Sequence, residues 1–299
     1  MLRRFSPITW FILLLLAAAT LALTLPPAPA TLHALHITTA VYRAAILTLI
    51  LPYGVIWFAA FYAFDMLAKY ASKIKSAREG EAFCRIARGI GIMAWGMALT
   101  TITALICNSI AARFHGFDRA HTIINNYIAL LVPIVAFITI STGTYRLTAI
   151  ARAKPGRIGS QILTFIYIVV AVFFMYFVMH NHVRNNPYRL PLVPLITTLI
   201  IPYIYAWFIG LLSAYELWLY AHKATGVLYR HALTRLATGL TIVIAAAIAV
   251  QYDANTYASK TNISLSTTLC IMYALLAAQA SGYVLIALGA KRLKMIEEV

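Results

Sequence analysis

The stretch from Ile46 to Phe58, ILTLILPYGVIWF, is matched 150 positions later by ITTLIIPYIYAWF, from Ile196 to Phe208. The match continues without a gap, so that residues 46–89 align with residues 196–239 and share 16 identical residues in 44 positions. Shared apolar composition alone does not produce so many identities. Because the chain has 299 residues, the pattern predicts one unit of about 150 residues present twice, as residues 1–150 and 151–299.

The composition indicates a membrane protein. Apolar residues make up 62% of the chain and charged residues 11%, whereas a soluble domain carries about a quarter charged residues. A helix needs roughly 20 apolar residues to cross a bilayer, and the uninterrupted apolar runs exclude the alternating strands of a barrel. We therefore predict an all-α polytopic membrane protein. Its eight transmembrane helices are expected near residues 8–25, 44–68, 89–110, 122–145, 161–180, 193–218, 236–252 and 265–288.

The first segment also resembles a signal peptide. Arg3 and Arg4 precede an apolar run, and Ala28-Pro29-Ala30 is similar to a cleavage site. However, its counterpart 150 positions on, residues 161–177, is internal and long enough to span. We therefore expect the first helix to be retained.

Four helices per unit bring the chain back to its starting side, so the two units are expected to be parallel repeats. The last helix of each unit supports this pairing at an offset of 146 residues, which implies a four-residue deletion between the seventh and eighth helices. The matched residues are Tyr127, Leu130, Gly143, Arg146, Leu147 and Ile150, against Tyr273, Leu276, Gly289, Arg292, Leu293 and Ile296.

The net charge of +16 follows the predicted topology, which argues against nucleic-acid binding. Of the 24 basic residues, 18 fall on one side: Arg3, Arg4, Lys69, Lys73, Lys75, Arg78, Arg85, Arg88, Arg146, Arg152, Lys154, Arg157, Lys223, Arg230, Arg235, Lys291, Arg292 and Lys294. Basic loops stay cytoplasmic, so both termini are expected in the cytoplasm. The loop predicted from Lys69 to Arg88 is the most basic, and anionic lipid headgroups are its expected partners.

The second helix of each unit carries the motif Pro-Tyr-x-x-x-Trp-Phe. Proline bends a membrane helix, and a Tyr and a Trp four residues apart share one helix face. The motif is therefore either a hinge with an aromatic face on a cavity between the units, or a bent helix whose aromatic residues pack in the core. Its residues are Pro52, Tyr53 and Trp57, and Pro202, Tyr203 and Trp207.

Two acids, Asp65 and Glu216, fall within predicted membrane helices, where carboxylates are rare and often functional. When the second unit is shifted by 150 residues, Glu216 aligns with Met66, next to Asp65, so both acids lie near the predicted cytoplasmic side. Asp65 has the spacing for a helical ion pair with Lys69. The alternatives are proton or cation coupling, and an ordinary hydrated charge near the headgroups.

Metal binding and catalysis have little support. His33, His36, His180 and His182 fall in equivalent outer loops, where a shared metal site is conceivable, but no carboxylates accompany them. A bridge between Cys107 and Cys270 stays open. No nucleotide loop, haem motif or serine nucleophile elbow is present in the sequence, so we expect no cofactor and no enzyme.

The stretch from Pro52 to Gly89 contains Pro-Tyr, Trp-Phe, Tyr-Ala-Ser-Lys-Ile-Lys and Arg-Ile-Ala-Arg-Gly. With these elements it resembles uncharacterised multi-pass membrane proteins of candidate-phyla bacteria such as Saccharibacteria. The resemblance implies a bacterial inner-membrane location. It implies no activity and no functional residues.

Two functions remain. The first is a small-molecule or ion transporter or channel, with the two Pro-Tyr helices facing each other across a hydrated cavity between the units. The second is a non-catalytic scaffold or sensor with a dry core, which docks a partner or anionic lipid through its basic cytoplasmic loops.

Overall fold

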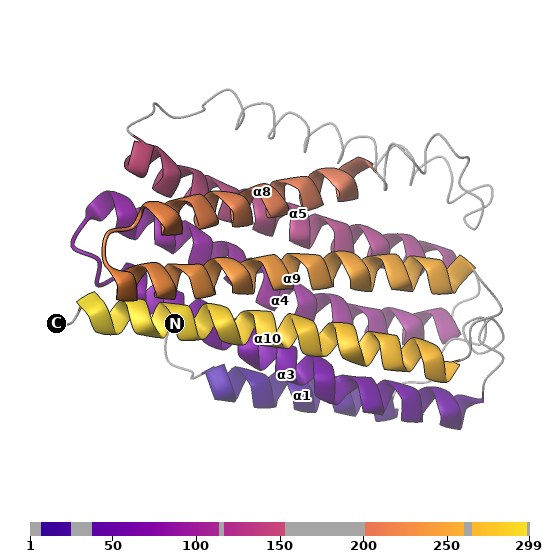
Figure 1. The fold of residues 1–299 in the computed structure, drawn as a ribbon. Helices are drawn as coiled ribbons and strands as arrows, with labels where there is room; N and C mark the ends of the chain where they lie inside the picture. The colour runs from indigo at the N-terminus through magenta and orange to yellow at the C-terminus, as the bar shows by residue number, and fades with distance from the viewer. Residues whose placement is uncertain (1–6, 25–37, 114–116, 153–200, 260–264, 298–299) are drawn as a thin grey trace.

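The computed structural model describes residues 7–24, 38–113, 117–152, 201–259 and 265–297, and these residues form seven helices (Figure 1). The helices are α1 (Pro7–Thr24), α3 (Thr39–Ala71), α4 (Ala77–Arg113), α5 (Phe117–Arg152), α8 (Ile201–Lys223), α9 (Val227–Ser259) and α10 (Leu265–Glu297). The all-α prediction is confirmed for this part of the chain. The predicted span at 161–180 and the start of the span at 193–218 lie outside it.

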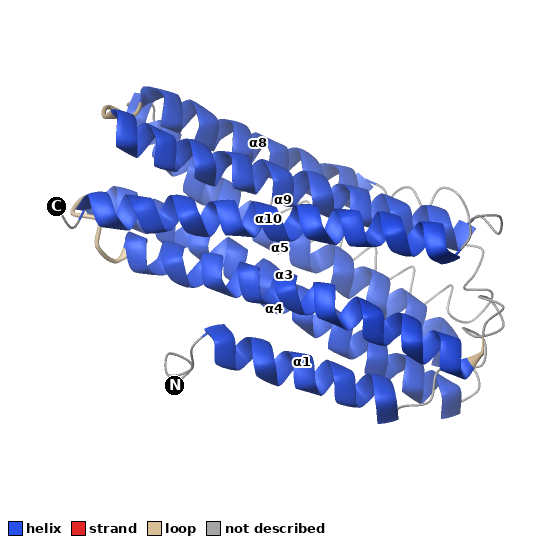
Figure 2. Cartoon of the chain, turned by 60° about the horizontal axis from the view of Figure 1, so that its bottom comes forward, coloured by secondary structure: helices blue, strands red, loops and turns tan. Residues whose placement is uncertain are grey.

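Six of these helices form a closed ring. Each of α3, α4, α5, α8 and α9 packs against the next, and α10 packs back against α3. Helix α1 lies outside the ring against α3 and α4, at one edge of the bundle in Figure 2. We call the contact between α3–α5 and α8–α10 the seam, because it separates the two predicted units.

Among the described residues, four helical segments are long and apolar enough to cross a membrane: Ile50–Ala71, Ala77–Thr103, Leu131–Ala151 and Cys270–Glu297. Large apolar side chains also face outward, including Leu51, Leu99 and Phe208, each more than half exposed. An outer surface of this kind suits lipid better than water.

The prediction that the chain from Lys69 to Arg88 forms a loop is wrong. Helix α3 continues to Ala71 and α4 begins at Ala77, so only residues 72–76 connect them. Ser76 caps α4, since its hydroxyl accepts a hydrogen bond from the backbone N–H of Glu79 at 3.4 Å, as in a Ser-x-x-Glu capping box. Residues 224–226 connect α8 to α9, where Gly226 adopts a φ of 99° that favours glycine. Most of the basic residues assigned to loops therefore lie on helix ends.

The α4–α5 and α9–α10 pairs approach closely at matching glycines. A methyl group on Gly89 would lie 2.8 Å from the carbonyl oxygen of Ala136, and one on Gly239 would lie 2.5 Å from that of Gly282. Gly89 and Gly239 are 150 residues apart, and Ala136 and Gly282 are 146 residues apart, which are the two offsets found in the sequence. A methyl group on Gly143 would likewise lie 2.6 Å from the carbonyl oxygen of Ala82, and one on Gly289 would lie 2.8 Å from that of Ala232, at positions related by the same two offsets.

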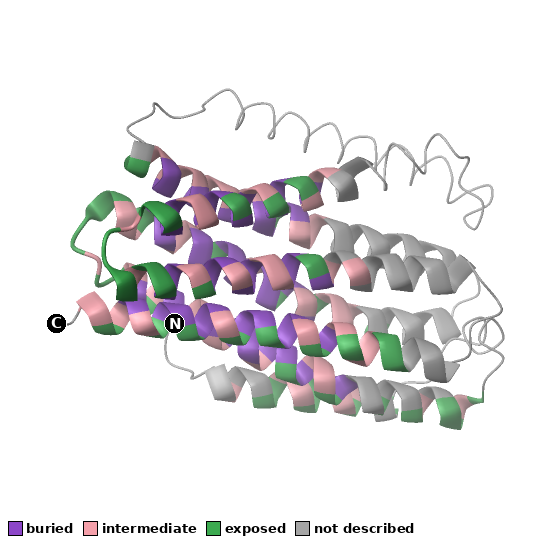
Figure 3. Cartoon of the chain, in the orientation of Figure 1, coloured by how far each residue is buried: buried purple, intermediate pink, exposed green. Residues whose placement is uncertain are grey.

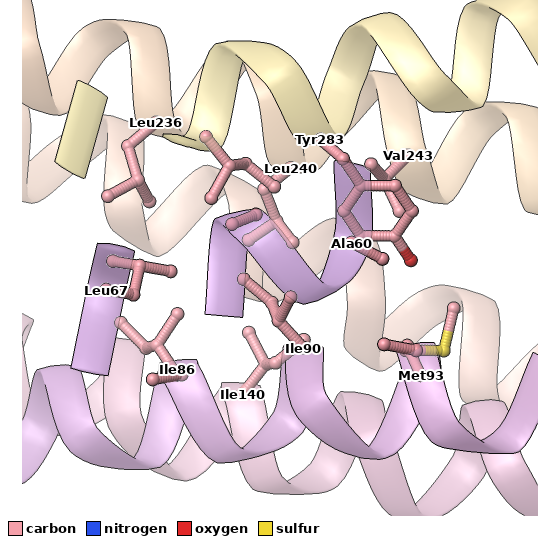
Figure 4. Packing of buried hydrophobic residues seen from close by; sticks show 14 of the residues in the cluster. Ala60, Leu67, Ile86, Ile90, Met93, Ile140, Leu236, Leu240, Val243 and Tyr283 are labelled. Carbon is pink, nitrogen blue, oxygen red and sulfur yellow. The ribbon is translucent and has the colours of Figure 1, made fainter. Parts of the chain in front are cut away.

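The centre of the described bundle is apolar and closely packed. Leu67, Ile86, Ile90, Leu236 and Leu240 belong to one buried cluster, and each is at most 1% exposed. Figure 3 shows buried residues spread along the helices of the ring, and Figure 4 shows Leu67, Ile86, Ile90, Leu236 and Leu240 meeting between α3, α4 and α9. The packing extends from one predicted unit into the other without a polar layer among the labelled residues.

Candidate functional site

The residues of the Pro-Tyr motif lie in different surroundings. On α3, Pro52 and Tyr53 are half-buried and Trp57 is fully buried in the core cluster. On α8, Trp207 is half-buried, and the side chains of Pro202 and Tyr203 lie outside the described part. Helix α3 packs on α1, α4 and α10, whereas α8 packs on α5 and α9. The hinge and cavity roles of the motif stay predictions.

The two predicted acids also differ. The Asp65 carboxylate and the Lys69 ammonium lie 2.6 Å apart, so the predicted helical ion pair is present, partly exposed to solvent. Glu216 is buried on α8 and accepts a hydrogen bond at 2.9 Å from the Thr144 hydroxyl on α5. Glu216 therefore contributes a polar contact across the seam, and coupling to a proton or cation stays a prediction.

The histidine and cysteine hypotheses are largely untouched. His33, His36, His180 and His182 lie outside the described residues, within which no three His, Cys, Asp or Glu side chains gather to hold a metal ion. Cys270 is an exposed free thiol, and the side chain of Cys107 is outside the description.

Basic residues gather at one end of the bundle, at the helix ends around Lys69–Arg88, Lys223–Arg235 and Lys291–Lys294, and we call this the basic end. The most distinctive polar contacts lie where the seam reaches it. The Tyr70 hydroxyl lies 3.2 Å from the Tyr229 hydroxyl, and the Tyr220 hydroxyl donates to the Glu79 carboxylate at 3.2 Å. Tyr70 and Tyr220 are 150 residues apart, and so are Glu79 and Tyr229. Each tyrosine at the end of α3 or α8 thus reaches the first turn of α9 or α4 in the opposite unit.

Phe83 packs between the two tyrosines from α3 and α8. Its ring makes edge contacts with Tyr70 at 4.9 Å and with Tyr220 at 6.5 Å, measured between ring centroids. We call Tyr70, Phe83, Tyr220, Tyr229 and Glu79 the tyrosine cluster. It closes the basic end of the seam with aromatic packing and hydrogen bonds that cross between the units.

Burial keeps the phenols of this cluster protonated. Tyr220 and Tyr229 lie beyond the apolar spans, and burial is the main cause that raises the pKa of each above its ordinary value. The neighbouring Tyr229 and the Glu79 carboxylate raise the pKa of Tyr220 further. Both hydroxyls are therefore neutral hydrogen-bonding groups over the physiological pH range.

A hollow of about 440 Å³ opens beside the cluster. Its volume falls within the range of small-molecule sites, about 300–1,000 Å³. Five helices contribute to its wall, through Glu79, Ile150, Ala151, Tyr220, Lys223, Ala224, Thr225, Tyr229, Ile296 and Glu297. Residues of both predicted units therefore line this hollow, which we call the end pocket.

Sequence reasoning found Tyr70 and Tyr220 only as one of the sixteen identical pairs at the 150-residue offset. Glu79 and Tyr229 differ from each other, so the repeat comparison did not single them out. The capping box at Ser76 and Glu79 was the available signal, because it places Glu79 in the first turn of a helix. Comparison of the chain with protein-family models, with curated proteins and with solved structures finds no match.

Proposed function

We propose that this chain is a multi-pass membrane protein of two tandem four-helix units that acts as a non-catalytic sensor or scaffold at one face of the bacterial inner membrane. The basic end of the bundle faces the cytoplasm and carries the functional surface. The observation that carries this proposal is the apolar packing at the centre of the seam, around Leu67, Ile90 and Leu240, which favours binding at the end of the bundle over passage through it.

The described seam is a poor route for a hydrated solute. Leu67 and Ile90 meet Leu240 in the buried cluster, and the tyrosine cluster covers them at the basic end. Moving a charge or a polar group through such packing costs several kcal/mol when no hydrogen bonds replace those to water. The apolar packing of these described residues therefore supports binding at the end of the bundle over passage along the seam.

The paired contacts support tandem units. Gly89 and Gly239 make matching backbone approaches, and Tyr70 and Tyr220 make matching contacts across the seam. The ring supports the same idea, because α3, α4 and α5 follow one another around it as α8, α9 and α10 do. The cytoplasmic orientation is supported by the basic residues, which gather at the end containing the short connections 72–76 and 224–226 (Figure 1).

Anionic lipid headgroups are the partners that this end fits. Exposed basic side chains ring it on three helices: Arg78 and Arg88 on α4, Arg235 on α9 and Lys291 on α10. Arg88 is 11 residues into α4, about 16 Å along the axis, so the basic residues form a belt rather than a flat loop. Each basic residue near an anionic membrane surface contributes about 1 kcal/mol.

Cysteine labelling tests the proposal. Cys84, Cys107 and Cys270 are first replaced by serine, and single cysteines are then placed at Leu240 in the seam and at Leu228, which is 57% exposed at the start of α9. In cells and in proteoliposomes, a membrane-impermeant maleimide should label Leu228→Cys from the cytoplasmic side alone. It should label Leu240→Cys from neither side. Labelling of Leu240→Cys would refute the closed seam and support transport.

Transport remains the second candidate because the tyrosine cluster has the form of a closed gate. It joins the predicted units at one mouth of the seam through two hydrogen bonds, from α3 to α9 and from α8 to α4, and both would break if the two units separated. A gate predicts that Leu240→Cys becomes reactive when Tyr70 and Tyr220 are both changed to phenylalanine. A scaffold predicts no such change.

A further inference from the structure

The end pocket has the opposite charge character to the surface around it. The chain carries a net charge of +16, and basic residues dominate this end of the bundle. The pocket lining nevertheless contains two carboxylates, Glu79 and Glu297, and one basic residue, Lys223. The lining thus keeps one net negative charge inside a basic belt.

The carboxylates have spare capacity to bind a ligand. Glu79 accepts one hydrogen bond, from Tyr220, and within the described residues the structure records no ion pair for either Glu79 or Glu297. By contrast, Glu81, two residues from Glu79, lies 2.5 Å from Arg146 and 3.1 Å from Arg85. Glu81 outside the pocket is therefore held by two arginines, whereas the described residues pair neither pocket carboxylate with a cation, although Lys223 belongs to the same lining.

Three helix C-termini add negative potential at the pocket, while the N-termini of α4 and α9, whose first turns hold Glu79 and Tyr229, oppose it in part. Helices α5, α8 and α10 all end at the pocket, where Ala151, Lys223 and Glu297 belong to its wall. The last carbonyl groups of a helix carry about half a negative charge and favour cations. Glu297 at the end of α10 repels these carbonyl groups, so a bound cation would relieve an unfavourable interaction.

The rest of the wall indicates what kind of cation fits. Ile150, Ala151, Ala224 and Ile296 supply apolar surface, and the neutral phenol of Tyr229 supplies a hydrogen-bonding group. A bare metal ion would gain nothing from the apolar wall, because hard cations need a close shell of oxygen ligands. An alkyl chain with an ammonium group can use both parts of the lining.

We infer that the end pocket binds a small alkyl diammonium cation, with one ammonium group on Glu79, the other on Glu297, and the alkyl chain between them against Ile150 and Ile296. This inference rests on the proposed function, because it supplies the ligand that a sensor at this face would detect. The pocket is lined from α4 and α5 in one unit and from α8, α9 and α10 in the other. Bound ligand therefore bridges the two units beside the tyrosine cluster.

Calorimetry on the full chain in nanodiscs of zwitterionic lipid tests the inference, with butane-1,4-diamine as the probe and butane-1,4-diol as its uncharged match. The diamine should bind saturably and the diol should not. Glu297→Gln and Glu79→Gln should each weaken diamine binding by about tenfold to a hundredfold, since a hydrogen bond to a charged group is lost. Glu81→Gln is the matched control and should bind as the unmodified chain does, because Glu81 is outside the pocket.

Several results would overturn the inference: no saturable binding of the diamine, equal binding of the diol, or equal weakening by Glu81→Gln and Glu297→Gln. If Glu79→Gln lowers folding yield by disturbing the start of α4, Glu297→Gln in the last turn of α10 decides the question alone. Failure of the proposed function is seen separately. A labelled Leu240→Cys refutes the closed seam, whereas an unlabelled seam without diamine binding refutes only the ligand.

Discussion

Replacing Gly239 with alanine tests whether the close helix approach holds the second unit together. The added methyl group would lie 2.5 Å from the carbonyl oxygen of Gly282, whereas ordinary contact begins at 3.4 Å. Relief therefore requires α9 and α10 to separate locally by about 0.9 Å, since the obstacle is backbone rather than a side chain that can rotate. Overpacking of this kind costs about 1–3 kcal/mol, and we take the upper end because backbone must move.

A matched variant removes the effect of helix propensity. Alanine gains about 1 kcal/mol over glycine inside a helix at either position. At Gly210 on α8 the methyl group would meet only side-chain atoms, of Ile244 at 3.2 Å and Phe137 at 3.3 Å. We therefore expect Gly239→Ala to destabilise the protein by about 2 kcal/mol net and Gly210→Ala to stay within about 0.5 kcal/mol of the unmodified chain.

Thermal unfolding in detergent measures the difference. At about 2–4 °C per kcal/mol for a chain of this size, Gly239→Ala should lower the Tm by about 4–8 °C. Gly89→Ala should behave like Gly239→Ala, because its methyl group would lie 2.8 Å from the carbonyl oxygen of Ala136. Equal Tm values for Gly239→Ala and Gly210→Ala would refute the reasoning, and a shift in Gly239→Ala without one in Gly89→Ala would refute the equivalence of the units.

Three further outcomes follow from burial and hydrogen bonding. Leu240→Ala, at a position 1% exposed, should cost about 2–5 kcal/mol in unfolding free energy, whereas Leu211→Ala, at a position 45% exposed, should cost less than about 1 kcal/mol. Chemical denaturation in detergent compares the two. Tyr220→Phe should cost about 1 kcal/mol by removing the hydrogen bond to Glu79, and Glu79→Ala should cost less in the Tyr220→Phe background than in the unmodified chain; fully additive losses would contradict that bond. Burial raises the pKa of the Tyr229 phenol above its unfolded value of about 10. The neutral phenol therefore contributes its full share of the folding free energy below pH 10, and this contribution is lost as the pH rises above 10. The Tm should fall as pH rises from about 10, and less steeply in Tyr229→Phe.

The helices were largely predictable because hydropathy determines where a chain can cross lipid. The ends of those helices were not. The segment from Ala77 to Arg88 contains enough charge to resemble a loop, but it also contains Ser76 and Glu79 at capping-box spacing and buried Ala82, Phe83 and Ile86 on one helix face. Weighting that periodicity above charge would have placed the start of α4 correctly.

The candidate site was much less predictable. Hydropathy describes single segments, and the repeat comparison describes pairs of equivalent positions. The tyrosine cluster instead joins positions that are not equivalent: Tyr70 with Tyr229, and Tyr220 with Glu79. Such contacts depend on how the two predicted units are placed relative to each other. The offset of 150 residues indicates that the two predicted units are similar, but it does not predict how they are placed relative to each other.

The difference between Glu79 and Tyr229 explains how two predicted units of similar sequence can form an asymmetric pocket. If both positions were glutamate, two carboxylates would approach each other near the junction of the units, and their repulsion in a partly buried site would oppose closure. If both were tyrosine, the cluster would close but the pocket would lose one of its two carboxylates. One glutamate and one tyrosine allow Tyr220 to donate to Glu79 while Tyr70 and Tyr229 bond to each other. Divergence at this single equivalent position therefore satisfies the hydrogen bonds of the seam and leaves negative charge facing the pocket.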